Sequence, residues 1–215
     1  MDRSRRMRGF TLVELTMAMV ITAITALSVA GATIALSKAH QDTEGFYQSL
    51  QTARGAMMRI QRSIQGAKLI TACDGTTLVL WAEDTDNSKR INADEIAMLV
   101  FDSTTREVRM YRLSFPGAVH DSLNVEVPLD TLVDTASAGS QVISSAYAET
   151  IVLASDAGDF FATPSPAPPM TTRVGLRLSI GTGTSAIALR SAASTRGAKT
   201  AMVALVGGDY VLVGY

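Results

Sequence analysis

The sequence predicts an α+β fold: a long N-terminal helix, membrane-spanning in its first half and amphipathic in its second, packed on an antiparallel β-sheet. Three observations predict it. An uncharged apolar stretch, residues 15–37, lies close to the N-terminus. Apolar residues then recur at helical spacing from Phe46 to Ala67, and short β-branched runs separated by turn residues make up most of the remainder.

The composition narrows the class of protein. With 215 residues, of which 47% are hydrophobic, the chain is long and apolar enough to form a folded core. The formal net charge is −1, so a phosphate-binding face is not indicated and no nucleic-acid partner is expected. The single cysteine, Cys73, excludes an internal disulfide and a cysteine-rich metal site.

The uncharged stretch is long enough to cross a bilayer. Residues 15–37 exceed the roughly 20 residues that a helix needs to span about 30 Å of hydrocarbon. Its many Thr, Ser, Ala and Gly residues suit close packing against other helices. Four arginines precede it, at positions 3, 5, 6 and 8, and predict that the N-terminus stays cytoplasmic while the rest is translocated.

The start of this stretch differs from an ordinary secretory signal. Such a signal has a shorter apolar core, and a carboxylate such as Glu14 at its beginning would be costly without a partner. Residues 8–15 read Arg-Gly-Phe-Thr-Leu-Val-Glu-Leu, which resembles the class III signal of type IV pilins and type II secretion pseudopilins. The alternative is a signal anchor that carries Gly-Phe-Thr and a glutamate by coincidence.

The resemblance implies a processing and assembly route. Prepilin peptidase would cleave between Gly9 and Phe10 and then N-methylate Phe10, so the apolar helix is retained. Glu14 would pair with the N-terminal amine of a neighbouring subunit, which relieves the cost of a buried unpaired carboxylate. The implied partners are the peptidase, other pilins or pseudopilins that contact the N-terminal helix, and the inner membrane.

An amphipathic stem follows the apolar stretch. Its apolar residues recur at spacings of three and four and are Phe46, Leu50, Ala53, Met57, Ile60, Ile64 and Ala67. The spacing predicts that the helix continues to about Lys68 and packs on a sheet, the alternative being a free-standing coiled coil. A long N-terminal helix on an antiparallel sheet is also the pilin-like fold that the resemblance implies. The expected divisions are a leader (1–9), a transmembrane and assembly helix (10–37), a stem (38–68) and a periplasmic β-rich domain (69–215).

The β-rich domain contains eight predicted strands and two predicted loops. The strands are 77–81, 96–101, 108–113, 150–153, 173–180, 186–190, 201–206 and 210–213. A stretch rich in Ser, Ala and Gly, 134–145, is predicted to be a loop. The proline-rich segment 163–169 is predicted to be an extended surface loop that cannot belong to a central strand.

One loop has the spacing of a calcium site. The oxygen donors lie at EF-hand-like positions and are Asp84, Asp86, Ser88, Arg90 (by its carbonyl), Asn92 and Glu95. Two features depart from that pattern, because Lys89 occupies the usual glycine position and strands flank the loop. The alternative is a solvated acidic hairpin loop, so Ca²⁺ is an expected but not a required cofactor.

Catalytic patterns are missing from the sequence. The two histidines, His40 and His120, have no partner pattern around them, and the sequence has no nucleophile elbow, P-loop or zinc-protease motif. The Gly-Thr-Gly-Thr run at 181–184 fits a strand turn. The sequence therefore predicts a structural protein, not an enzyme.

The predicted function is a minor pseudopilin or minor pilin of a type II secretion pseudopilus or a type IV pilus. Within the family, the chain is most similar to the minor pseudopilin J or to PilW-type minor pilins. It would cross the inner membrane once and then join the fibre. The alternative is a membrane-anchored periplasmic binding module, either a calcium-dependent adhesin or a DNA-uptake factor. The candidate DNA contacts for the latter are Arg173, Arg177, Arg190, Arg196 and Lys199.

Overall fold

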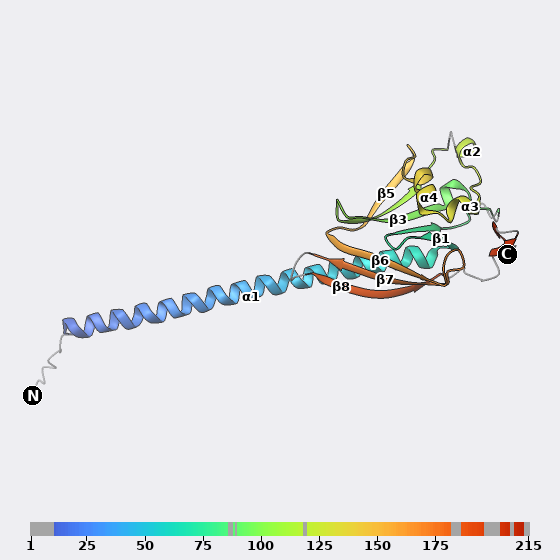
Figure 1. Cartoon of the computed structure of the whole chain (residues 1–215). Helices are drawn as coiled ribbons and strands as arrows, with labels where there is room; N and C mark the ends of the chain where they lie inside the picture. The colour runs from blue at the N-terminus through green and yellow to red at the C-terminus, as the bar shows by residue number, and fades with distance from the viewer. Residues whose placement is uncertain are drawn as a thin grey trace, which may run out of the picture. The chain divides into compact units, whose positions relative to one another are not determined.

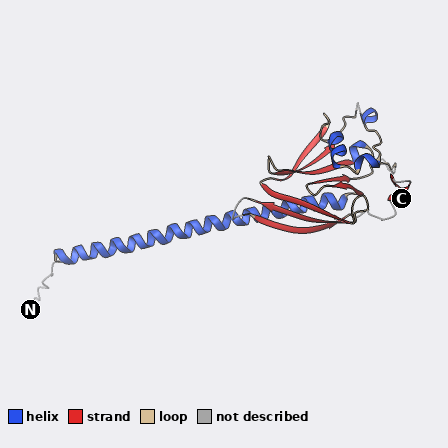
Figure 2. Cartoon of the chain, in the orientation of Figure 1, coloured by secondary structure: helices blue, strands red, loops and turns tan. Residues whose placement is uncertain are grey.

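The structure, a computed structural model, describes residues 11–85, 88, 90–117, 120–181, 186–195, 203–206 and 209–212 (Figure 1). The chain divides into two compact units, Met1–Tyr47 and Gln48–Tyr215. Helices and strands follow the order that the sequence predicts, with one long helix first and strands after it (Figure 2). The predicted α+β class is therefore confirmed.

Helix α1 (Leu12–Gly66) supplies all the regular structure of the first unit and the start of the second. It passes through Gly31, Gly45 and Gly55 without a break and ends close to the predicted limit at Lys68. It is the one described helix that is long and apolar enough to cross a membrane. All the described residues of the first unit are exposed, so no described part of the chain covers its apolar side chains.

The second unit contains three antiparallel sheets. The largest has the strand order β1–β2–β3–β4–β5, with β1 (Leu69–Cys73), β2 (Thr77–Trp81), β3 (Ile96–Asp102), β4 (Glu107–Leu113) and β5 (Ala148–Ala154). A second sheet has the order β6–β7–β8, with β6 (Ala157–Ser165), β7 (Arg173–Ile180) and β8 (Ile187–Ser194). A hairpin of β9 (Val203–Val206) and β10 (Asp209–Leu212) forms the third. Every pairing is antiparallel, as the short strands and tight turns require.

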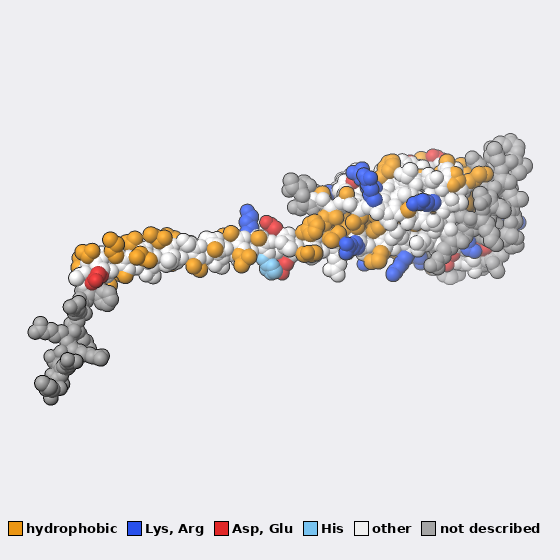
Figure 3. All heavy atoms as spheres, turned by 90° about the horizontal axis from the view of Figure 1, so that it is seen from below, with side chains coloured by type: hydrophobic (Ala, Val, Ile, Leu, Met, Phe, Trp, Pro, Cys, Tyr) orange, Lys and Arg blue, Asp and Glu red, His pale blue; other side chains and the backbone are white. Residues whose placement is uncertain are grey.

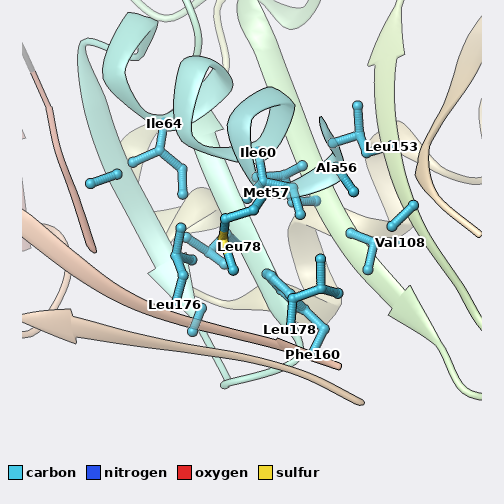
Figure 4. Packing of buried hydrophobic residues seen from close by; sticks show 14 of the residues in the cluster. Ala56, Met57, Ile60, Ile64, Leu78, Val108, Leu153, Phe160, Leu176 and Leu178 are labelled. Carbon is cyan, nitrogen blue, oxygen red and sulfur yellow. The ribbon is translucent and has the colours of Figure 1, made fainter. Parts of the chain in front are cut away.

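The second half of α1 forms one core with both larger sheets. Figure 4 shows its apolar side chains directed toward residues of β2, β4 and β5 and of β6 and β7. Ile60 and Ile64 are completely buried, as are Leu78 on β2 and Phe160 on β6. Burial of each such side chain contributes about 2 kcal/mol. The amphipathic stripe thus packs on sheets and is not a free-standing coiled coil.

A second core covers the opposite face of the five-stranded sheet. Short helices α3 (Leu129–Leu132) and α4 (Thr135–Val142) pack there with Trp81 and Met98, while η1 (Ala93–Glu95) and α2 (His120–Leu123) lie in connecting segments. The prediction of a loop over 134–145 is wrong. Asp134 caps α4 by accepting a hydrogen bond from the Ser137 backbone N–H, and Ala138 is completely buried.

Each of the eight predicted strands is present in whole or in part, and two further strands, β1 and β6, were not predicted. β1 follows α1 almost directly and is buried on both faces, so its residues lack the alternation that marks a half-buried strand. β6 includes Pro164 within the segment predicted to be a loop, but it is an edge strand, where proline is tolerated. The exclusion of this proline from a central strand therefore holds.

Candidate functional site: the start of the N-terminal helix

Thr11 and Glu14 form a capping box at the first turn of α1. The Thr11 backbone N–H and hydroxyl both donate to Oε2 of Glu14, at 2.9 and 3.0 Å. The Glu14 backbone N–H in turn donates to the Thr11 hydroxyl at 3.3 Å. This reciprocal pattern satisfies donors that a helix N-terminus leaves free, and the carboxylate also complements the positive end of the helix dipole.

Thr11 is a site residue that was not predicted from the sequence. The predicted partner of Glu14 is the amine of another subunit, whereas the chain itself supplies hydrogen-bond donors to this carboxylate. The signal was available, because Thr-x-x-Glu before an apolar run is the sequence pattern of a capping box. Gly9 and Phe10, the predicted cleavage and methylation residues, lie outside the described residues.

The helix that follows exposes a dense apolar surface. Large apolar side chains between Leu12, 80% exposed, and Leu36, 73% exposed, surround this part of α1 (Figure 3). An exposed apolar surface of this extent is unfavourable in water and is typical of helices that contact lipid or other helices. The residues involved are Leu12, Val13, Leu15, Met17, Met19, Val20, Ile21, Ile24, Leu27, Val29, Ile34 and Leu36.

Hydroxyl groups within this surface are satisfied by the helix itself. Thr22 donates to the Ala18 carbonyl at 2.7 Å, Ser28 to the Ile24 carbonyl at 2.9 Å, and Thr33 to the Val29 carbonyl at 2.8 Å. A polar group that already has a partner within its helix needs no water. The composition is therefore compatible with hydrocarbon despite its many hydroxyl residues.

In the predicted calcium loop, the carboxylate of Glu95 is buried and already hydrogen-bonded within the protein. Glu95 is 1% exposed, and its carboxylate accepts four hydrogen bonds from within the protein. The donors are Trp81 Nε1 (3.1 Å), the Thr85 backbone N–H (2.6 Å), the Thr85 hydroxyl (3.1 Å) and the Asn92 backbone N–H (3.2 Å). Both oxygens are used, so this carboxylate would have to exchange protein donors for a metal in order to close a calcium site.

The other predicted ligands differ in their surroundings. Oδ1 of Asp84 is buried and has no hydrogen-bond partner among the described residues, so it is an acceptor that a cation could satisfy. The Ser88 hydroxyl and the backbone of Arg90 lie within hydrogen-bond distance of each other. Asp86 and Lys89 lie outside the described residues, and among the residues that are described no group of three or more His, Cys, Asp or Glu side chains could hold a metal. The calcium site stays a prediction.

The two histidines have carboxylate partners that the sequence did not indicate. His40 Nε2 lies 3.1 Å from Glu44, one helical turn away, and His120 Nε2 lies 3.1 Å from Asp94 Oδ2. His120 borders a cavity of about 490 Å³ with Leu80 among its lining residues. A histidine–carboxylate pair in a cavity does not by itself define a reaction, since catalysis also requires a reacting group in geometric reach.

The late basic residues are dispersed over the second sheet. Arg177 on β7 lies 3.5 Å from Asp159 on β6, and Arg173 and Arg190 are exposed strand residues. Arg196 and Lys199 lie outside the described residues. The described arginines therefore have the character of solvated strand residues, one of them already paired with a carboxylate.

Comparison with known proteins gives one match, and it covers the N-terminal segment. Residues 4–30 match the family described as "Prokaryotic N-terminal methylation motif". No curated protein and no solved structure matches the chain. The matched segment includes the predicted cleavage residues, Glu14 and the start of the exposed apolar helix. This motif is the type IV pilin-like prepilin signal, and it supports a pilin- or pseudopilin-type subunit processed at its N-terminus.

Proposed function

We propose that the protein is a minor pseudopilin or minor pilin, a structural and non-catalytic subunit of a type II secretion pseudopilus or a type IV pilus. The observation that carries the proposal is the methylation motif over residues 4–30, which continues directly into an exposed apolar helix. The internally satisfied hydroxyl groups of that helix support insertion, first into the inner membrane and then among other helices of a fibre.

In this proposal, prepilin peptidase cleaves after Gly9 and methylates the new amine of Phe10. Thr11 and Glu14 then become the second and fifth residues of the mature chain. The capping box holds the Glu14 carboxylate at the helix terminus, where the terminal amine of a neighbouring subunit can pair with it. The hydrogen bonds from Thr11 use only Oε2 of Glu14, so Oε1 of Glu14 remains available for that amine.

The proposed orientation, subfamily and metal ligand are argued from other parts of the chain. The basic N-terminal residues support a cytoplasmic N-terminus and a periplasmic β-rich unit. The size of that unit, with three sheets and two hydrophobic cores, supports a minor subunit similar to pseudopilin J or to PilW-type minor pilins. We include Ca²⁺ in the proposal as a ligand of the loop around Asp84, because Oδ1 of Asp84 is buried without a partner.

The first experiment determines the intact mass and N-terminus of the protein from membranes, with prepilin peptidase present and with it deleted. We expect a peptidase-dependent species that begins at Phe10 and carries one additional methyl group. Gly9→Leu should block cleavage, while Glu14→Gln, the matched variant beyond the cleavage site, should still be cleaved. A chain that stays uncut with active peptidase, or one cut beyond Ser28, would contradict the proposal.

A further inference from the structure

The part of α1 that belongs to the second unit carries positive charge without a balancing carboxylate. Residues 48–66 contain Arg54, Arg59 and Arg62 and no Asp or Glu. All three arginines are exposed, and among the described residues their side chains have no ion pair and no hydrogen bond. Arg59 and Arg62 are three positions apart, so they are neighbours on the helix surface and repel each other.

These arginines surround an exposed apolar side chain. Met58 is 52% exposed, although most large apolar side chains on this part of α1 are buried. Arg54, Met58 and Arg62 follow one another at intervals of four, which places them in one row along the helix. We call Arg54, Met58, Arg59 and Arg62 the basic row. Unpaired cations around an apolar residue are suited to a partner that presents carboxylates around an apolar residue.

The complementary pattern occurs at the junction of α3 and α4. Residues 113–147 contain no Lys or Arg. Asp130 and Asp134 are exposed and flank Val133, which is 36% exposed, and we call these three residues the acidic corner. Neither carboxylate has an ion pair among the described residues. Their hydrogen bonds at the starts of α3 and α4 use Oδ1 of Asp130 and Oδ2 of Asp134, so the other oxygen of each can accept from a cation.

The two surfaces lie on opposite sides of the same strands. α1 packs on the face of the five-stranded sheet that carries Leu78 and Leu80, whereas α3 and α4 pack on the other face with Trp81 and Met98. The basic row and the acidic corner therefore cannot meet within one copy. A contact between them joins two different surfaces, so it is heterologous and can repeat from copy to copy. It also lets all copies keep one orientation, with their N-terminal helices entering one membrane in the same direction.

We propose that the basic row of one copy binds the acidic corner of a second copy. Met58 then packs against Val133, and the arginines pair with Asp130 and Asp134. Charge complementarity identifies the occupant, because the same chain presents both surfaces with their charged groups unpaired. Single surface ion pairs are weak, so the contact depends on several pairs together and on the high local concentration of copies held in one membrane.

Cysteine trapping of the full-length protein in its membrane tests the contact. Two differently tagged forms, Met58→Cys and Val133→Cys, are co-expressed in a Cys73→Ala background and mildly oxidised. We expect a disulfide-linked dimer that carries both tags, and about tenfold less dimer when either form is expressed alone. A chain with both substitutions should give a ladder of higher oligomers, because a head-to-tail contact repeats. Ala188→Cys, at an exposed position on β8, replaces Val133→Cys in the matched control and should give about tenfold less mixed dimer.

Charge reversal tests the electrostatic part of the contact. Arg54→Glu together with Arg62→Glu, placed in the Met58→Cys form, should lower the yield of mixed dimer by about tenfold. The matched control reverses two exposed arginines of the three-stranded sheet, Arg173→Glu and Arg190→Glu, and should leave the yield unchanged. The arginines of the basic row are exposed and unpaired within the chain, so their reversal should also leave the unfolding midpoint unchanged.

Three results would overturn the proposal. They are the absence of the mixed dimer, equal dimer yields from one form alone and from the two together, and equal losses in the two charge-reversal variants. The proposed contact needs neither cleavage after Gly9 nor pairing at Glu14, so trapping should be the same in cells without prepilin peptidase. Failure of this contact is therefore distinguishable from failure of the proposed function.

Discussion

At the scale of single residues, the Glu14 carboxylate has two kinds of hydrogen-bond partner in the proposed fibre. Within the chain it completes the capping box with Thr11, and in the proposed fibre it also accepts the amine of a neighbouring subunit. These roles are compatible because a carboxylate offers about four lone-pair positions. Thr11 is then a positioning residue, since it orients the carboxylate before a neighbouring subunit arrives.

Replacement of Thr11 should therefore loosen the first turn of α1. In Thr11→Val the hydroxyl that accepts from the Glu14 N–H is lost, and we expect amide exchange at residues 12–15 to accelerate about fivefold. Exchange measured on the full-length protein in detergent micelles checks this. Thr11→Ser keeps the hydroxyl and should exchange like the natural chain; equal rates in all three proteins would contradict the capping role.

The loop around Asp84 gives a second prediction at this scale. If Ca²⁺ satisfies the unpartnered Oδ1 of Asp84, millimolar calcium should raise the unfolding midpoint by about 5 °C relative to chelator. Asp84→Asn should remove most of that difference. Glu83→Gln, one residue away and not among the predicted ligands, is the matched control and should preserve it. Identical midpoints with calcium and with chelator would exclude the site.

At the scale of elements, the two halves of α1 differ in what surrounds them. The half before Tyr47 exposes its apolar side chains, whereas the later half buries one stripe between two sheets. Sequence periodicity predicted that stripe, and Ala53, Met57, Ile60 and Ile64 are all buried, whereas Phe46, its first predicted member, is 50% exposed. Stability of the β-rich unit should therefore depend strongly on which face of this helix is changed.

Ile60→Ala tests that dependence. Ile60 is completely buried, so its truncation should lower the free energy of unfolding by about 3 kcal/mol. Met58 lies two positions away on the outer face and is 52% exposed, so Met58→Ala should change it by less than about 0.5 kcal/mol. Urea unfolding followed by fluorescence of the single tryptophan, Trp81, measures both. Equal losses in the two variants would show that the stripe does not face the core.

The cap of α4 predicts a pH dependence. The Ser137 hydroxyl and backbone N–H donate to Asp134 and hold the pKa of that carboxyl below its ordinary value of 3.8. A lowered pKa means that the ionised cap stabilises the fold at neutral pH, and that this contribution is lost as the pH falls below 3.8 through the folded-state pKa.

The comparison of Asp134→Asn with the natural chain isolates this titration. Asparagine can still accept the hydrogen bond from Ser137 but does not ionise. The unfolding midpoint of the variant should therefore fall less steeply with acidification between about pH 4 and about pH 2, the range that begins at the ordinary pKa of an aspartic acid carboxyl. Thermal unfolding at several pH values measures the difference. Parallel curves for the two proteins would show that the cap does not contribute to acid sensitivity.

At the scale of the whole molecule, the N-terminal motif and the fold are two independent observations, because they come from different parts of the chain. The motif is confined to residues 4–30, while the sheets and both cores lie in the second unit. No curated protein or solved structure matches the chain, so the role in a fibre that we propose for the β-rich unit rests on the N-terminal segment to which it is attached.

The sequence alone determined the features whose signals are local. A charge-free run, a 3–4 apolar spacing and a short signal before Glu14 each depend on residues close in the chain, so the α+β class and the apolar helix could be predicted. Strands with clear alternation, such as β7 with its repeated buried positions, were predicted for the same reason.

Tertiary contacts decided the rest. α4 forms although its composition resembles a loop, because burial of Ala138 and Val142 against the sheet offsets weak helix propensity. Glu95 turns inward to Trp81, whose indole N–H needs a partner once it is buried, and no sequence spacing encodes that requirement. The order of strands likewise placed β5 at the edge of its sheet, because the position of an edge depends on pairing between residues far apart in the chain.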